Sequence, residues 1–273
     1  MSSFAAIPVL TLGGGGHALT LVESAHAAHR PVLGFYDDNP VAPLAAKAGL
    51  RCMGSLADGL AALARAHQSW IARGGATHPA QAPGHATLEQ LGYGGFTSAG
   101  QFALPPQQFI LAMGDLATRA ATLARAASAG VAIDSPLWGI IAHPSASIAA
   151  SARIEPGVSI GPLAIVQAFA RVRAHAIINS GAIVEHDCDI AQNCHLAPGS
   201  VLGGSVRVGD AQAGPDAGVL VGLGSRVLPN LSIGAGSVVG AGAVVVEDVG
   251  ASSRAVGVPA RVRGRGDGET ERR

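Results

Sequence analysis

Two adjacent residues in the second half of the sequence, His186 and Asp187, have the side chains needed to move a proton. An imidazole titrates near neutral pH, and a neighbouring carboxylate can hold its tautomer and raise its basicity. His186 is therefore a candidate general base with Asp187 as its partner. Because the chain contains 10 histidines, a surface histidine without a catalytic role is the alternative interpretation.

The same segment contains two of the three cysteines, Cys188 and Cys194. A thiol could act as a nucleophile that carries an acyl group. Both cysteines, however, occupy positions where the repeat described below has small residues, which favours buried structural thiols. Together with Cys52 they form an odd number in a pattern unlike a zinc site, so we expect no disulfide scaffold and a reducing compartment.

A second candidate site lies near the N-terminus, where glycines at positions 13–16 follow an apolar run and precede a segment compatible with a helix. Backbone amides at the start of a helix can hold a phosphate, but tight turns also use glycine. Asp37 and Asp38 end the next apolar run. An acid at that place also holds the ribose of NAD in dehydrogenases, but the repeat in the second half of the chain argues against hydride chemistry.

The elements that would position this N-terminal site alternate between strands and helices. The apolar runs predict strands at 7–12, 32–36, 109–113 and 131–133, and helices at 18–28 and 116–127. This order indicates an α/β, Rossmann-like domain with a parallel sheet over residues 1–143. Residues 66–105, rich in Gly, Ala, Pro, His and Thr, break the pattern and predict an irregular insert.

From residue 146 onward, an aliphatic residue recurs at every sixth position. Neither a helix nor an ordinary strand has this period, which instead indicates stacked turns of a three-sided coil with the aliphatic residue pointing inward. Gly161, Gly209, Gly222, Gly234 and Gly240 follow such residues, where we expect turns that need a free φ angle. Seven extra residues within 211–218 predict a loop that leaves the coil. The inward positions are Ile148, Ile154, Ile160, Val166, Val172, Ile178, Val184, Ile190, Leu196, Leu202 and Val208, then Val221, Val227, Ile233, Val239 and Val245.

The composition excludes several classes of protein. The sequence has 18 basic and 18 acidic residues and a formal net charge of zero, whereas proteins that coat nucleic acids or membrane surfaces need a basic excess. No apolar run approaches the ~20 residues that span a bilayer, and no basic stretch precedes the first apolar run as in a signal peptide. We therefore expect a cytoplasmic protein without nucleic-acid or membrane partners.

The six-residue ladder resembles that of the hexapeptide-repeat acyltransferases, which implies a left-handed parallel β-helix over residues 144–261 and a polar tail at 262–273. Further similarity comes from the N-terminal glycines with His17, from Asp37 and Asp38, from residues 178–188 and from the closing Gly-Val-Pro-Ala-Arg at 257–261. Together these resemble the sialic acid O-acetyltransferase-like family of sugar acyltransferases. That family includes bacterial enzymes that N-acetylate UDP-linked 4-amino sugars.

The resemblance implies an acetyl-CoA-dependent N-acetyltransferase that acts on a nucleotide-linked amino sugar by direct attack. It also implies a homotrimer with CoA in a groove between adjacent β-helices, and no metal. In this interpretation His186 is the general base, Asp187 tunes it, and Asn179 belongs to the active site. The implied CoA contacts are His195, Gly204, Leu223 and Ala241. The implied nucleotide-sugar contacts are Gly15, Gly16, His17, Asp37, Asp38 and Gly114.

Three alternatives remain open at this point. The acceptor could be a sugar hydroxyl, as in sialic acid or polysaccharide O-acetylation. A zinc hydratase uses the same coil with three histidines, but His175, His186 and His195 stand at different offsets within the six-residue repeat, which argues against convergence on one metal. A non-catalytic nucleotide-sugar-binding scaffold would need none of these side chains for chemistry.

Overall fold

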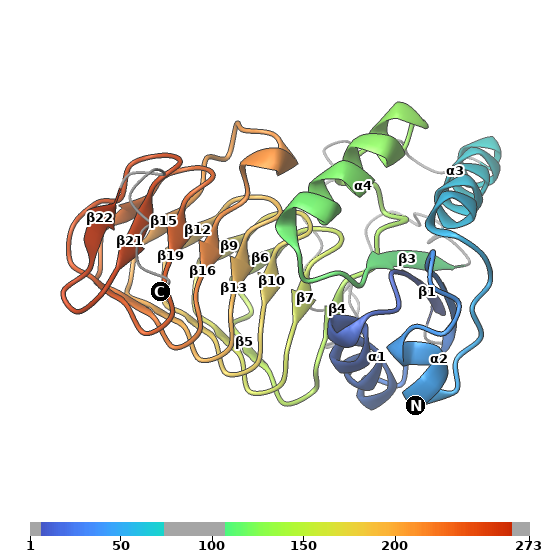
Figure 1. Ribbon diagram of the computed structural model, residues 1–273, viewed down its shortest axis with the longest axis horizontal. Helices are drawn as coiled ribbons and strands as arrows, with labels where there is room; N and C mark the ends of the chain where they lie inside the picture. Colours follow the sequence, from blue (N-terminus) through green and yellow to red (C-terminus); the bar gives the residue numbers. More distant parts are fainter. Residues whose placement is uncertain (1–6, 74–106, 264–273) are drawn as a thin grey trace, which may run out of the picture. The chain divides into compact units, whose positions relative to one another are not determined.

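A computed structural model describes residues 7–73 and 107–263 of the chain. These residues divide near Pro144 into two compact units, an α/β unit and a coil of short strands. Figure 1 shows the two architectures in the N-terminal and C-terminal parts of the chain. Among the described helices, none has the length and apolar character required for a membrane span.

The N-terminal unit is built on a parallel sheet with the strand order β2-β1-β3 (Figure 1). The strands are β1 (Val9–Leu12), β2 (Val32–Tyr36) and β3 (Gln108–Leu111), and β4 (Ile141–Ala142) ends the unit. The helices are α1 (Gly16–Ala27), α2 (Pro43–Ala48), α3 (Leu56–Ala72) and α4 (Leu116–Ser128). The predicted alternation of strands and helices is confirmed.

Both faces of this sheet are buried, as expected for a parallel sheet. On one face, Leu10 and Leu12 pack in a core with Leu63 of α3 and Leu123 of α4. On the other face, Val9 packs in a separate core with residues of α1 and α2 that include Leu21, Val22 and Leu44. The alternation of side chains along β1 therefore holds helices on both sides of the sheet.

Two predicted elements of this unit differ from the structure. Residues 66–72 belong to α3, so they are helical rather than part of an irregular insert; the remainder, 74–105, lies outside the described residues. A capping box between Ser55 and Asp58 starts this helix, and the apolar residues Leu60, Leu63 and Trp70 keep it on the core. Residues 131–133 form no strand, because the amide of Val131 donates to Ala126 O and closes α4.

The C-terminal unit is a coil whose strands form three faces, each a stack of parallel strands (Figure 1). The first face contains β7 (Ser159–Ile160), β10 (Ile177–Ile178), β13 (His195–Leu196), β16 (Leu220–Val221), β19 (Val238–Val239) and β21 (Arg254–Val256). The second face contains β5 (Ser147–Ile148), β8 (Ile165–Val166), β11 (Ile183–Val184), β14 (Val201–Leu202), β17 (Arg226–Val227) and β20 (Val244–Val245). The third face contains β6 (Arg153–Ile154), β9 (Arg171–Val172), β12 (Asp189–Ile190), β15 (Arg207–Val208) and β18 (Ser232–Ile233).

We name the corners of the coil after the face that they follow. In one representative turn, residues 179–182 form the first corner, 185–188 the second and 191–194 the third. All predicted inward residues from Ile154 to Val245 are buried, which confirms the period of six. Each inward side chain therefore contributes to a continuous apolar core in which every turn covers the next.

The register confirms the predicted loop. Ile177 pairs with His195, a step of 18 residues for one turn, whereas His195 pairs with Leu220, a step of 25. The seven extra residues leave the coil between β15 and β16 and include a short 3-10 helix, Pro215–Ala217. Asn193 Nδ2 donates to Pro215 O over 2.7 Å, which ties the loop to the third corner.

The glycines that follow inward residues are required for a different reason from the predicted need for a free φ angle. Of the five, only Gly209 has a positive φ. A Cβ on Gly161 would lie 2.8 Å from Ser180 N, and one on Gly234 would lie 2.4 Å from Ala251 N, so these glycines allow neighbouring turns to approach. Left-handed φ angles occur two residues later in the corner, for example at Asp187 and Asn193.

The end of the coil also differs from the prediction. β22 (Arg261–Arg263) pairs antiparallel with β21, and Val262 lies opposite Ala255. Residues 262 and 263 are thus a paired strand rather than the start of a polar tail. The remaining predicted tail, 264–273, lies outside the described residues.

Candidate active site

His186 and Asp187 lie together on the second corner of the coil, after β11. His186 Nδ1 is 2.8 Å from Asp187 Oδ2. A carboxylate can only accept, so the neutral ring carries its proton on Nδ1 and has its lone pair on Nε2. Both side chains are exposed, at 59% and 56%. The pair therefore presents an outward-facing nitrogen that can accept a proton.

The backbone of this corner is held by both neighbouring turns. Asp187 adopts a left-handed conformation with a φ of 60°, which short polar residues tolerate better than most. The amide of Asp187 donates to Ala168 O over 3.0 Å, and the carbonyl of His186 accepts from Ser205 N over 2.8 Å. The two functional side chains thus project from a fixed backbone.

Gly204, on the second corner of the next turn, lies directly beside the His186 ring. A Cβ added to Gly204 would be 2.6 Å from both Cε1 and Nε2 of His186. No side chain fits there without moving the imidazole. The structure therefore groups Gly204, which was predicted as a CoA contact, with the candidate base.

Asn179 and His195 form a second polar pair on a different corner. Asn179 follows β10 on the first corner, and its Nδ2 is 3.1 Å from Nε2 of His195 on β13. The first corners of later turns carry Leu223 and Ala241, and the amide of Gly242, beside Ala241, donates to Leu223 O over 2.7 Å. Asn179, His195, Leu223 and Ala241 therefore share one edge of the coil.

The predicted catalytic set is consequently split within one chain. Asn179 precedes β11, whereas His186 follows it, so a whole side of the coil separates their corners. The structure brings His186 together with Asp187 and Gly204, but not with Asn179.

The residues predicted to hold the nucleotide sugar gather at the carboxyl ends of β1, β2 and β3. Gly15 caps the N-terminus of α1, and a Cβ on Gly15 or Gly16 would meet nothing within 4 Å. A Cβ on Gly114 would lie 3.6 Å from Cβ of His17. These positions leave open space above exposed helix amides, as a phosphate cradle requires.

The two acids of this region already have local partners. Asp37 Oδ2 accepts from Gly14 N over 2.7 Å, and its Oδ1 accepts from Asn39 N over 2.8 Å. Asp38 Oδ1 accepts from Leu56 N over 3.1 Å at the start of α3. Both carboxylates shape the edge of the sheet, and their predicted contact with a nucleoside stays a prediction.

Two residues near these groups escaped the sequence analysis. Arg119 of α4 is buried, its Nη1 donates to Met113 O over 3.0 Å, and burial lowers its pKa to about 10. Phe169 is 70% exposed on the second corner one turn before Asp187, with a left-handed φ of 59°. Phe169, like Leu163 and His175, is a large residue in a slot that most other corners fill with Gly, Asn, Asp or Ser, and this was a detectable signal. Burial of Arg119 within an Ala-rich helix depends on tertiary packing and left no such signal.

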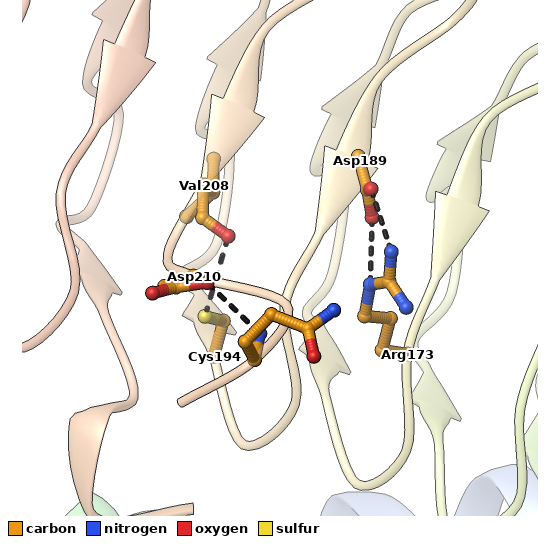
Figure 2. A network of polar contacts seen from close by, with 6 residues as sticks. Arg173, Asp189, Cys194, Val208 and Asp210 are labelled. Atoms are coloured by element: carbon orange, nitrogen blue, oxygen red, sulfur yellow. Dashed lines mark hydrogen bonds and ion pairs between the residues drawn. The ribbon is translucent and has the colours of Figure 1, made fainter. Parts of the chain in front are cut away.

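The two cysteines of the coil, Cys188 and Cys194, are buried. Cys188 Sγ is 3.2 Å from Gly203 O, and Cys194 Sγ is 3.8 Å from Val208 O, the latter shown in Figure 2 beside the Arg173–Asp189 ion pair. Burial raises the pKa of the Cys188 thiol to about 11 and that of Cys194 to about 12. A thiolate nucleophile at neutral pH is disfavoured at both positions.

The histidines of the zinc hydratase alternative are spread over the coil. His175 is buried on the third corner, whereas His186 is on the second corner and His195 is on the first face. Within residues 7–73 and 107–263, no group of three or more His, Cys, Asp or Glu side chains could hold a metal ion.

Comparison with solved structures decides the family. No family model matches the sequence. PerB from Caulobacter crescentus, determined with CoA and GDP-perosamine, is 30% identical and superimposes with a TM-score of 0.68 over 96% of this chain and 100% of PerB. The chain belongs to the hexapeptide-repeat sugar N-acetyltransferases. The predicted left-handed β-helix and the predicted acyltransferase class are thereby confirmed.

Two further comparisons show a shared fold and a short local similarity. The acetyltransferase domain of PglB from Neisseria gonorrhoeae, determined with acetyl coenzyme A, shares the fold with 23% identity and a TM-score of 0.67, covering 94% of this chain and 100% of that domain. A serine acetyltransferase of Escherichia coli K12 is 42% identical over 52 residues, which is 19% of each chain. This last match spans only a fifth of the enzyme's length.

Proposed function

We propose that this sugar N-acetyltransferase transfers an acetyl group from acetyl-CoA to the amino group of a nucleotide-linked sugar, with His186 as general base. The observation that carries this proposal is the exposed His186–Asp187 pair, whose 2.8 Å contact leaves Nε2 able to accept a proton. PerB, which covers the whole architecture, binds CoA and GDP-perosamine. Two further PerB structures carry alanine or asparagine in place of one histidine, which marks a histidine of interest in that relative.

The chemistry requires one proton acceptor and no covalent enzyme intermediate. The amine nitrogen attacks the thioester carbonyl, and His186 Nε2 takes the proton that the nitrogen loses. The C–S bond then breaks, and the thiolate of CoA leaves with a proton from the imidazolium. The raised pKa values of Cys188 and Cys194 argue against an acyl-cysteine route.

We further infer that the active unit is a homotrimer in which each site lies between two chains. Asn179 and His195 occupy one edge of the coil and His186 occupies another, and a second chain that supplies one of the two groups would let one acetyl-CoA molecule contact both. Acetyl-CoA and nucleotide sugars are cytoplasmic metabolites, and we propose that location for the enzyme.

The substrate test is an acetyl-transfer assay with UDP- and GDP-linked 4-amino sugars and their 4-hydroxy counterparts. We expect acetylated product from an amino sugar and a loss of at least ~100-fold in kcat for His186→Ala with the fold retained. His26→Ala, an exposed histidine on α1, is the matched control and should keep full activity. Labelling of the hydroxyl compounds alone would exclude N-acetylation, and unchanged activity of His186→Ala would exclude this base.

The assembly test mixes two inactive variants. His186→Ala and His195→Ala chains, each weakly active alone, should recover activity when they are co-expressed, because some interfaces then combine an intact His186 with an intact His195 from the neighbouring chain. Light scattering should report three chains per particle. Failure of the mixture to exceed either variant would place the site within one chain and contradict the shared interface.

A further inference from the structure

Residues 203–206, the corner that contains Gly204, lack a closing backbone hydrogen bond of their own. A corner of this kind closes when the amide of its fourth residue donates to the carbonyl of its first. No such bond joins Val206 N to Gly203 O in the described part of the chain. A side chain from the preceding turn contacts both ends of the corner instead.

That side chain is Cys188, which is buried at the fourth position of the preceding second corner. Its Sγ lies 3.2 Å from Gly203 O. Burial raises the pKa of the thiol to about 11, while hydrogen bonds from the amides of Val206 and Ser205 act against this rise. The thiol therefore keeps its proton at neutral pH and donates it to Gly203 O. The sulfur thus bridges the first and fourth residues of the corner.

Two serines at the fourth position of other corners show when such a bridge forms. Ser237 Oγ donates to Gly250 O over 2.7 Å and accepts from Ser253 N over 3.1 Å, which are the first and fourth residues of a corner in the next turn. Corner 222–225 closes with its own backbone bond, and Ser200 Oγ in the turn before it has no hydrogen-bond partner within the described residues. A polar side chain at this position therefore bridges a corner that is open.

The bridge from Cys188 fixes the peptide on which the candidate base rests. A trans peptide points its C=O and its N–H in opposite directions, so the N–H of Gly204 faces away from the buried sulfur that Gly203 O contacts. A Cβ on Gly204 would lie 2.6 Å from His186 Nε2, and the amide of Ser205 donates to His186 O over 2.8 Å. The same corner thus contacts both the ring and the backbone of the base.

We propose that Cys188 is a positioning residue for the candidate base, because its thiol holds residues 203–206 in the open conformation that leaves room for the His186 imidazole beside Gly204. Without the bridge, the backbone can close the corner with its own hydrogen bond, and the resulting shift of Gly204 displaces the ring. The thiol itself takes no part in the transfer. This inference rests on the proposed acetyl transfer, in which a displaced base lowers kcat.

Cys188→Ala and Cys188→Val remove the bridge and still fit the coil, because Ala170 and Val206 are buried at the same position in the turns before and after. Cys188→Ser restores a group that can donate and accept, as Ser237 does. Ser237→Ala is the matched control, because it breaks an equivalent bridge at a third corner, away from the candidate base.

The ring is observed through the 1H–13C resonances of His186 in full-length protein labelled at histidine, with His186→Gln to assign them. We expect Cys188→Ala and Cys188→Val to shift these resonances and to lower kcat by at least ~10-fold, with both KM values within about twofold of wild type. Cys188→Ser should keep the wild-type resonances and a kcat within about threefold. Ser237→Ala should lower the melting temperature and leave kcat and the resonances unchanged.

Unshifted His186 resonances in Cys188→Ala would overturn the inference, as would a serine variant that behaves like the alanine variant. An equal loss of kcat in Ser237→Ala would also overturn it, because the bridge would then act through general stability. If Cys188→Ala does not fold, Cys188→Val decides the question. If the wild type transfers no acetyl group to any amino sugar, the proposed function fails, and the resonances still decide whether Cys188 positions the ring.

Discussion

Gly204 is the residue against which the His186 imidazole rests: a Cβ at position 204 would lie 2.6 Å from His186 Nε2. The candidate base therefore depends on the absence of a side chain in the next turn. Its orientation towards Asp187 is set from one side by a carboxylate and from the other by bare backbone.

We expect Gly204→Ala to displace the imidazole and to lower kcat by at least ~10-fold, because small misplacements of a catalytic group are costly. Gly250→Ala is the matched control, since its added Cβ would meet only Ser253 Oγ at 3.7 Å. Steady-state kinetics and circular dichroism of both variants test this expectation. A normal kcat in Gly204→Ala would show that the His186 imidazole can move away from the added Cβ and still act as the base.

Asp187→Asn should reduce kcat by about tenfold, and by less than His186→Ala does. Asparagine tolerates the left-handed φ of 60° at this corner, so the backbone stays in place while the negative charge beside Nδ1 is lost. The pair is exposed to water, which limits the size of the effect. A variant as inactive as His186→Ala would mean that Asp187 does more than support the ring.

Ser200 and Ser225 occupy equivalent buried slots of the coil but differ in their hydrogen bonds. Ser225 Oγ donates to Gly222 O over 2.8 Å, whereas Ser200 Oγ has no hydrogen-bond partner in the described part of the chain. We expect Ser225→Ala to lower stability by about 1 kcal/mol and Ser200→Ala to leave it unchanged or raise it. Denaturant midpoints compare the two variants, and equal losses would contradict the difference.

The raised pKa values of the two buried thiols predict a loss of folding stability at alkaline pH. Burial raises the pKa of Cys188 to about 11 and of Cys194 to about 12, above the ordinary 9.0. The stabilisation linked to these protonated thiols is complete below pH 9 and is lost as the pH rises through 11 to 12.

At neutral pH, iodoacetamide should modify Cys52 before either coil cysteine, as read by peptide mass spectrometry. Early labelling of Cys188 would show that its corner opens readily.

Much of the coil could be predicted because a six-residue period repeats one physical requirement, an aliphatic residue inside each side. The same arithmetic predicted the loop between Val208 and Val221. The same spacing indicates that Asn179 and His186 lie on different corners. Asn179 follows one inward residue, and His186 follows the next one. The resemblance implies that both belong to the active site, and it does not say which chain supplies each residue.

Other features could not be predicted from the sequence. The extension of α3 through residue 72 depends on packing of Trp70 against the sheet, which a Gly- and Pro-rich continuation obscured. The role of Gly161 and Gly234 follows from the distance between turns, and a sequence records glycine without recording whether space or φ demands it. The roles of the site residues are proposals that the experiments above address.

The loop between β15 and β16 has a consequence for how this coil can change. Seven additional residues lie outside the coil at this corner, and Leu220 still pairs with His195. These seven extra residues leave the pairing of the flanking strands unchanged. Insertions between Asp210 and Gly214 could therefore lengthen the loop without changing the register of the strands, whereas Pro215 and Ala217 are held to the coil by Asn193 and Gly236.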